Sequence, residues 1–182
     1  MSTAGASDRL TIRALRAADE AEALAADAEL ADEDFDFLLR SEGASFAEYL
    51  VALERIRLGQ GLSPGQVPAT FLAAFVHDDL VGRVSIRHAL SERLALVGGH
   101  IGYAVRPKFR QNGFAIAILR QALDLASEMG IELALVTCDD SNIGSIATIE
   151  RCGGELDHSK HTQGQQKLRY WIPTPTPRKG QR

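Results

Sequence analysis

The sequence is poor in cysteine and has no excess of positive charge. Its 182 residues include only two cysteines, Cys138 and Cys152, too few for a disulfide framework and without partners at metal-ligand spacing. With 20 basic and 24 acidic residues the formal net charge is −4, whereas a general nucleic-acid binder needs a basic face. We therefore expect no nucleic-acid partner and no metal centre, and we interpret both cysteines as small apolar residues.

Long apolar runs are also missing. No stretch approaches the length of a membrane span, and the first ten residues lack the basic start and apolar centre of a secretory signal. These absences predict a cytoplasmic protein with no membrane partner. The 45% hydrophobic and 24% charged residues are typical of a soluble globular protein. We expect one domain over residues 1–172 and, because proline and charge dominate there, a disordered tail at 173–182.

Apolar periodicity predicts antiparallel strands first and a strand, helix, strand, helix unit afterwards. Strand patterns occupy 10–15, 70–77, 80–87, 100–105 and 131–137, with weaker ones near Leu156 and at 169–172; helical patterns occupy 16–30, 45–56, 114–130 and 143–151. Ser45 and Glu48 have the spacing of a capping box, and Asp78 and Asp79 form a tight hairpin connection. This order indicates an α/β protein with a mixed sheet rather than a fully wound parallel one.

The junction at 106–115 places two basic residues and a glycine between a strand and a long helix. The first backbone N–H groups of a helix have no partner inside it, and the helix dipole adds partial positive charge there. Gly113 allows close approach of the backbone to a phosphate, with Lys108 and Arg110 nearby to offset charge. Neither a Walker loop nor a dinucleotide fingerprint is present, so the junction is either a diphosphate site or an ordinary connection.

Two motifs resemble the GNAT acyltransferase family. Its acetyl-coenzyme A (acetyl-CoA) motif has Arg or Gln, two free residues, Gly, one free residue, then Gly or Ala, and Arg110, Gly113 and Ala115 match it. A second segment, after the next strand, has an Asn, a small residue three positions on and a closing glycine, matched by Asn142, Ser145 and Gly153. Segments such as GGHIGYAVRP and TCDDSNIGSI further resemble a bacterial subgroup of uncharacterised acetyltransferases.

The resemblance covers residues 70–154, which would form the acyl-CoA-binding core, whereas 8–69 follow the family's variable substrate-side part by element order alone. It implies a mostly antiparallel sheet with helices on both faces and a splayed central strand pair. It also implies an N-acetyltransferase that moves an acetyl group from acetyl-CoA, without a metal, to an amine of a small molecule or peptide. The implied cofactor-binding residues are Tyr103, Ala104 and Val105 through their backbone, then Lys108, Arg110, Gln111, Asn112, Gly113, Phe114, Ala115 and Asn142.

Proton transfer in such a reaction needs a base for the amine and a proton donor for the thiol. An alkylamine is neutral in only about one molecule in 2,500 at pH 7, so a base is useful, and His100, just before the cofactor-facing strand, is the candidate. His100 could instead be a core residue, and Asn142 could be merely a helix cap. Many family members donate a proton from a tyrosine seven positions after the Asn, where this chain has Ile149. Ser145, another hydroxyl or water would then serve.

Several alternatives stay open. The run from Asp19 to Asp36 has nine carboxylates and no Lys or Arg; it is a solvated face or a field that attracts a cationic amine. His77, His88, His158 and His161 form no convincing metal cluster. The absent tyrosine favours, as runner-up, a non-catalytic acyl-CoA-binding module or sensor, and a purely structural interaction protein would bind no CoA. Exposed strands make a homodimer plausible.

Overall fold

A seven-stranded sheet organises the protein. The structure, a computed structural model, describes residues 10–41, 43–158 and 167–176. Within them the strands lie in the order β1-β2-β3-β4-β5-β7-β6. Their bounds are β1 Leu10–Arg13, β2 Ala69–Val76, β3 Asp79–Arg87, β4 Ile101–Val105, β5 Leu133–Asp139, β6 Glu155–Leu156 and β7 Lys167–Pro173. All neighbours are antiparallel except β4 and β5, which confirms the mixed, mostly antiparallel sheet.

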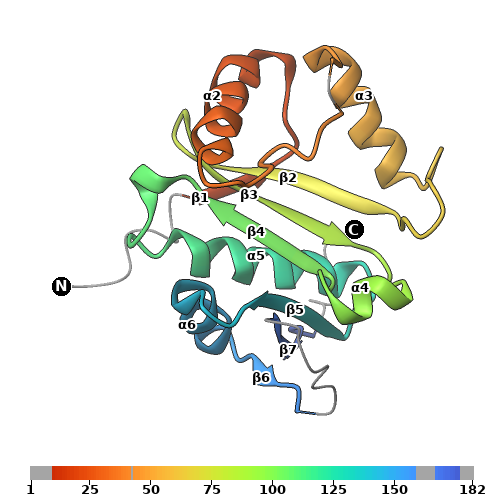
Figure 1. The fold of residues 1–182 in the computed structure, drawn as a ribbon, viewed down its shortest axis with the longest axis vertical. Coiled ribbons are helices and arrows are strands. Elements are labelled where there is room, and N and C mark those ends of the chain that lie inside the picture. The colour runs from red at the N-terminus through yellow and green to blue at the C-terminus, as the bar shows by residue number, and fades with distance from the viewer. Residues whose placement is uncertain (1–9, 42, 159–166, 177–182) are drawn as a thin grey trace.

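Helices cover both faces of the sheet (Figure 1). They are η1 Ala17–Asp19, α2 Glu20–Ala31, α3 Phe46–Arg57, α4 Glu92–Leu96, η2 Pro107–Phe109, α5 Phe114–Glu128 and α6 Ile143–Arg151. One core lies under α2 and α3, against Phe71 and Ala73 of β2. The other lies between the sheet and the pair α5 and α6, and includes Val84 and Ile86 of β3. Adjacent strand residues thus point into different cores, as the two-residue period requires.

The local signals at helix α3 and at the hairpin had different outcomes. The Ser45 Oγ accepts from the Glu48 N–H at 3.3 Å, and the Glu48 carboxylate accepts from the Ser45 N–H at 2.9 Å, so the predicted capping box is confirmed. The hairpin turn was predicted one residue late. His77, with φ of 55°, makes the turn with Asp78, and Asp79 already begins β3.

Strands β4 and β5 diverge immediately after they meet. Their parallel pairing is limited to Ile101 opposite Val136, preceded by a 2.7 Å hydrogen bond from the His100 N–H to the Leu135 carbonyl. On its other side β4 pairs with β3 along its full length, up to Gly82 opposite Val105. One edge of β4 is therefore open beyond Ile101, which confirms the splayed central pair.

The remaining differences lie outside the core. Helix α4 lies between two predicted strands, where no helix was predicted. It is short, and the Ser91 side chain caps its N-terminus. Pro173 ends β7, and the Thr174 hydroxyl donates to the Ile131 carbonyl at 2.6 Å. The first residues of the predicted tail at 173–182 therefore lie against the sheet, and 177–182, like His161, lie outside the described residues. No helix in the described ranges has the length and apolar content needed to cross a bilayer.

Candidate active site

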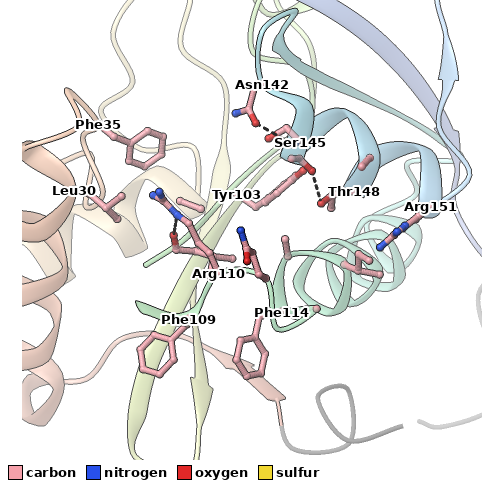
Figure 2. Close-up of a pocket in the computed structure, with 18 of the residues that line it drawn as sticks. Leu30, Phe35, Tyr103, Phe109, Arg110, Phe114, Asn142, Ser145, Thr148 and Arg151 are labelled. Carbon is pink, nitrogen blue, oxygen red and sulfur yellow. Dashed lines mark hydrogen bonds between the residues drawn. The ribbon is translucent and has the colours of Figure 1, made fainter. Parts of the chain in front are cut away.

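A cavity of about 670 Å³ lies where β4 and the start of α5 face α6 (Figure 2). Tyr103 and Val105 line it from β4, Gly113 and Phe114 from the turn, and Ser145 from α6. The end of α2 and the segment after it, including Glu33 and Phe35, close one side. The volume falls in the range of about 300–1,000 Å³ that is usual for small-molecule sites.

The turn before α5 presents bare backbone amides to this cavity. Gln111 has φ of 61° and Gly113 φ of 80°, so the chain passes twice through the left-handed region that orients successive N–H groups toward one side. In the described structure no protein group accepts a hydrogen bond from the N–H groups of residues 111–115. The Asn112 side chain stabilises the turn by donating to the Arg110 carbonyl at 2.9 Å. This is the geometry that binds phosphate at a helix N-terminus.

Arg110 is held at the rim of the cavity by an acidic residue. Its two terminal nitrogens donate to the Glu33 carboxylate at 3.0 and 2.6 Å, and its Nε donates to the Val105 carbonyl at 3.1 Å. This hydrogen-bonded pair lowers the pKa of Glu33. Lys108 is exposed, with its Nζ 5.0 Å from the centre of the Phe109 ring. Both predicted cations therefore lie at the turn, but only Lys108 is without a carboxylate partner in the described structure.

Arg106 is a structural residue of the site that sequence reasoning missed. Its side chain is 2% exposed and donates to Glu29 at 2.8 and 2.5 Å, to Glu22 at 2.7 Å and to the Leu80 carbonyl at 3.0 Å. These bonds fasten α2 to the strand end that leads into the turn. No spacing in the sequence pointed to these contacts, because Arg106 and Glu29 are 77 residues apart.

The acidic run is therefore more than a solvated face. Besides the pairs already described, Asp19 bonds Arg13 at 2.6 and 2.8 Å, and Asp27 accepts from the Leu38 N–H at 3.0 Å. These carboxylates are engaged in holding the chain, which weakens the hypothesis that the run attracts an amine by its field.

The open edge of β4 is where the resemblance places the acyl-CoA backbone contacts. The Val105 carbonyl lies at this edge, since it accepts from the Arg110 side chain rather than from β3. Backbone groups two residues apart face the same edge of a strand, so the N–H and C=O of Tyr103 also lie there, whereas those of Ala104 face β3. Tyr103, through its N–H and C=O, and Val105, through its N–H, are thus the described β4 residues with backbone groups available to an extended ligand.

The Tyr103 side chain points at α6, toward Ser145 and Thr148 (Figure 2). Its hydroxyl is buried and makes no hydrogen bond of good geometry with any described group. The neighbouring Thr148 hydroxyl donates to the Gly144 carbonyl at 2.8 Å. Burial raises the pKa of Tyr103 to about 12, although the two neighbouring hydroxyls oppose the shift. Ile149, at the usual tyrosine position, is fully buried in the core and points away from the cavity.

Asn142 and Ser145 meet at the start of α6. The Asn142 Oδ1 accepts from the Ser145 N–H at 2.9 Å, so the helix-cap reading of Asn142 holds. The amide nitrogen of Asn142 has no protein partner in the described structure, and both residues line the cavity. Asn142 can therefore cap the helix with its oxygen and still donate to a ligand with its nitrogen.

His100 lies at the point where β4 and β5 part, and it does not line the cavity. It is 9% exposed, and its Nδ1 accepts from the Leu135 N–H at 2.9 Å. Burial and the nearby Arg87 lower its pKa. This placement gives His100 a strand-joining role, and its use as the base stays a prediction.

The other histidines and the cysteines form no site in the described ranges. His88 bonds the Thr70 hydroxyl at 2.8 Å, and no group of three potential metal ligands is found among the described residues. Cys138 and Cys152 are both free. Burial raises the pKa of the Cys138 thiol to about 11, so it behaves as the small apolar residue that we expected.

Several solved acetyltransferase structures share this fold. The chain also matches yncA from Salmonella typhimurium, solved with its cofactor acetyl-CoA, at TM-score 0.60 and 16% identity, covering 92% of this chain and 95% of that one. Mycobacterium smegmatis RimJ, in complex with CoA-disulfide, gives TM-score 0.63 and 18% identity over 90% of this chain and 81% of that one. A spermidine N-acetyltransferase SpeG chimera from Vibrio cholerae and hSSAT gives TM-score 0.59 and 17% identity over 91% and 96%.

At these identities the structural likeness shows the fold alone. No curated protein sequence matches the chain significantly. The family model described as acetyltransferase (GNAT) domain, however, matches residues 9–155, which is most of the chain. That match includes the bare amides of the turn, the open edge of β4 and the start of α6. The chain belongs to the GNAT family of acetyltransferases.

Proposed function

We propose that the protein is an N-acetyltransferase that transfers the acetyl group of acetyl-CoA to the amine of a small molecule. The observation that carries this proposal is the cavity itself. In one space it joins the unpartnered backbone amides of Gln111, Gly113, Phe114 and Ala115, the open edge of β4 and the buried Tyr103 side chain. A purely structural protein has no use for the buried, unpaired Tyr103 hydroxyl, because leaving a buried polar group without a partner costs free energy.

The donor groups of the site match the parts of acetyl-CoA. The amides of residues 111–115 and the exposed Lys108 would hold the diphosphate. The Tyr103 backbone and the Asn142 amide nitrogen would bond the amide groups of the pantetheine arm. Acetyl-CoA supplies an activated acyl group on a thiol that leaves readily. The residues of the chain have to position it and manage protons.

In the reaction the amine nitrogen forms a bond to the acetyl carbon, the bond from that carbon to sulfur breaks, and the nitrogen loses one proton. The departing sulfur needs a proton or a strong hydrogen bond. We assign that task to Tyr103, because the residue lines the cavity, its buried hydroxyl lacks a well-formed bond, and its pKa is raised to about 12, so it stays protonated at neutral pH. Ser145 also lines the cavity and is the alternative donor from the same helix-facing wall.

The test compares acetyl-CoA with S-acetyl pantetheine, which has the same thioester but no nucleotide or diphosphate. Calorimetry should show that the wild-type protein binds acetyl-CoA far more tightly. The variant Gly113→Asp, which places a carboxylate at the exposed turn, should lose that preference and keep its fold. Thiol release with a panel of amines should show turnover. Equal affinity for the two thioesters, or binding without turnover of any amine, would contradict the proposal, the latter in favour of a binding module.

A further inference from the structure

Two arginines of β3, Arg83 and Arg87, lie on the face of the sheet opposite the Tyr103 side chain. Residues 83, 85 and 87 of β3 share one face because strand side chains alternate. Arg83 stands opposite Ala73 on β2 and Ala104 on β4, and Ser85 stands opposite Gly102. This is the face that α2 and α3 cover, since Ala73 belongs to the core beneath them. Two arginines are therefore buried or half-buried on the side of β4 away from α5 and α6.

Arg83 is a buried cation without a carboxylate. It is 5% exposed, and its Nη2 donates only to the backbone carbonyl of Asp36, at 3.3 Å. Its Nε is buried and has no partner. The other two arginines classed as buried in the described structure, Arg106 and Arg169, both pair with carboxylates, Arg169 with Asp157 at 3.1 Å. Arg83 is thus the exception in a chain that otherwise neutralises its buried guanidiniums.

A second cation lies beside it. Arg87 donates through Nη1 to the carbonyls of Gly98 and Gly99 at 3.0 and 3.1 Å and has no carboxylate within ion-pair distance among the described residues. Burial and then Arg87 lower the pKa of Arg83 to about 10, and the opposing effects of Tyr49 and Asp36 are smaller. Desolvated like charges are costly. The rings of Phe35 and Phe71, whose centres lie 5.1 and 5.7 Å from the Arg83 guanidinium carbon, offset only part of that cost.

Neither arginine lines the cavity itself, but Arg83 lies next to residues that do. Ala104, directly opposite Arg83, lines the cavity, and so does Phe35, whose ring centre is 5.1 Å from the Arg83 guanidinium carbon. Next to them the strand is bare: a Cβ built on Gly102 would meet only the Arg87 Nη1, at 3.9 Å. There is space over Gly102, with a guanidinium at its edge, on the far side of β4 from the Tyr103 hydroxyl.

We propose that Arg83 and Arg87 bind a carboxylate of the acceptor, so that the amine substrate is a small amino acid rather than a simple alkylamine or polyamine. The inference rests on the proposed function. A guanidinium pairs with a carboxylate through two parallel hydrogen bonds. The Nε of Arg83 has no partner in the described structure, so it can supply one of these two bonds. Arg83 lies beneath α2 and α3 rather than on an exposed surface, so this position suits a free amino acid better than a residue on the surface of a folded protein.

The experiment uses matched acceptors: the common amino acids and their carboxamides, which differ only in the carboxylate. Acetyl-CoA turnover is followed by thiol release for wild type, Arg87→Met, Arg83→Met and Arg83→Lys, with exposed Arg120→Met as the control. Wild type and the control should prefer at least one amino acid over its amide by about 10- to 100-fold in kcat/KM, the value of one or two hydrogen bonds to a charged group. Arg87→Met and Arg83→Met should lose this preference through KM, and Arg83→Lys should keep part of it.

A second readout does not depend on turnover. In the presence of CoA, amino acids should protect the wild-type protein against thermal unfolding more than their amides do, and Arg87→Met should abolish the difference. Equal turnover and equal protection by acids and amides would overturn the inference, as would variants that slow both acceptors alike. CoA affinity, measured by calorimetry, is the check on folding. If amides are acetylated as well as acids, only this inference fails. If CoA does not bind, the proposed function fails.

Discussion

Glu33 and Arg110 form a two-bond ion pair across the mouth of the cavity, from the end of the α2 region to the turn that precedes α5. Glu33 thereby places a carboxylate beside amides that we expect to bind a diphosphate. The pair fixes the orientation of Arg110 and at the same time reduces the positive field at the turn. The substrate-side part of the chain thus acts directly on the proposed nucleotide site.

Replacing Glu33 should therefore strengthen CoA binding. Glu33→Gln removes a negative charge and releases Arg110, and we expect an affinity increase of about 2- to 10-fold that shrinks as salt is added. Calorimetry at two salt concentrations measures it. Glu54→Gln is the matched control, because Glu54 forms a similar exposed pair with Arg57 on α3. Weaker binding by Glu33→Gln would show instead that the pair preorganises the site.

Tyr103→Phe should slow the chemical step. It removes one hydroxyl and keeps the ring, so we expect kcat to fall by about 10- to 100-fold with CoA affinity nearly unchanged. Steady-state kinetics and calorimetry give the two values. Ser145→Ala is the comparison: if it produces the loss and Tyr103→Phe does not, the proton donor is Ser145.

Glu29→Gln should destabilise the protein by about 1–2 kcal/mol at neutral pH. Arg106 would keep Glu22, and Glu29 is partly exposed, so the loss is smaller than for a fully buried pair. Urea unfolding measures the change, with Glu20→Gln, an exposed carboxylate on the same helix, as the control. An effect no larger than that of Glu20→Gln would mean that the Arg106 cluster does not hold α2 in place.

The same pair predicts a pH dependence. The hydrogen bond to Arg106 lowers the pKa of Glu29 below its ordinary value of 4.5. The pair therefore stabilises the fold above pH 4.5, and this contribution is lost as the pH falls through the lower folded-state pKa. The difference in unfolding free energy between wild type and Glu29→Gln should be constant near neutrality and shrink in acid. A difference that grew in acid would contradict the assignment.

His100→Ala distinguishes a base from a strand-joining residue. If His100 serves mainly to accept from the Leu135 N–H, the variant should lose about 1–3 kcal/mol of stability and keep a pH–rate profile of unchanged shape. If the acidic limb of the profile disappears instead, His100 is the base after all.

Local patterns predicted the parts of the fold that depend on neighbours in sequence. Ser45 and Glu48 cap α3 as expected, and Gly113 opens α5 in the left-handed conformation that only its backbone adopts without strain. The helices on both faces of the sheet and the splayed strands came from the family resemblance. The contacts that shape the site were out of reach of spacing, because Arg106 meets Glu29 across 77 residues of sequence.

Side-chain direction was the other limit. Tyr103 was predicted to act through its backbone, and alternation alone did not say that its ring would lie against α6. Arg83 offered a signal that was not used, a cation inside the apolar strand LVGRVSIR. A charged residue at an inward position of a buried strand has to meet a partner or a ligand.

The central claim is that the backbone N–H groups of residues 111–115 hold the diphosphate of the acyl donor. Amide chemical shifts of ¹⁵N-labelled protein, titrated with CoA and separately with pantetheine, test it most directly. We expect CoA to change the amide chemical shifts of Gln111, Gly113 and Phe114 strongly and pantetheine to leave them unchanged. If CoA leaves these chemical shifts unchanged, or if pantetheine changes them as much, the diphosphate binds elsewhere and the proposed site is wrong.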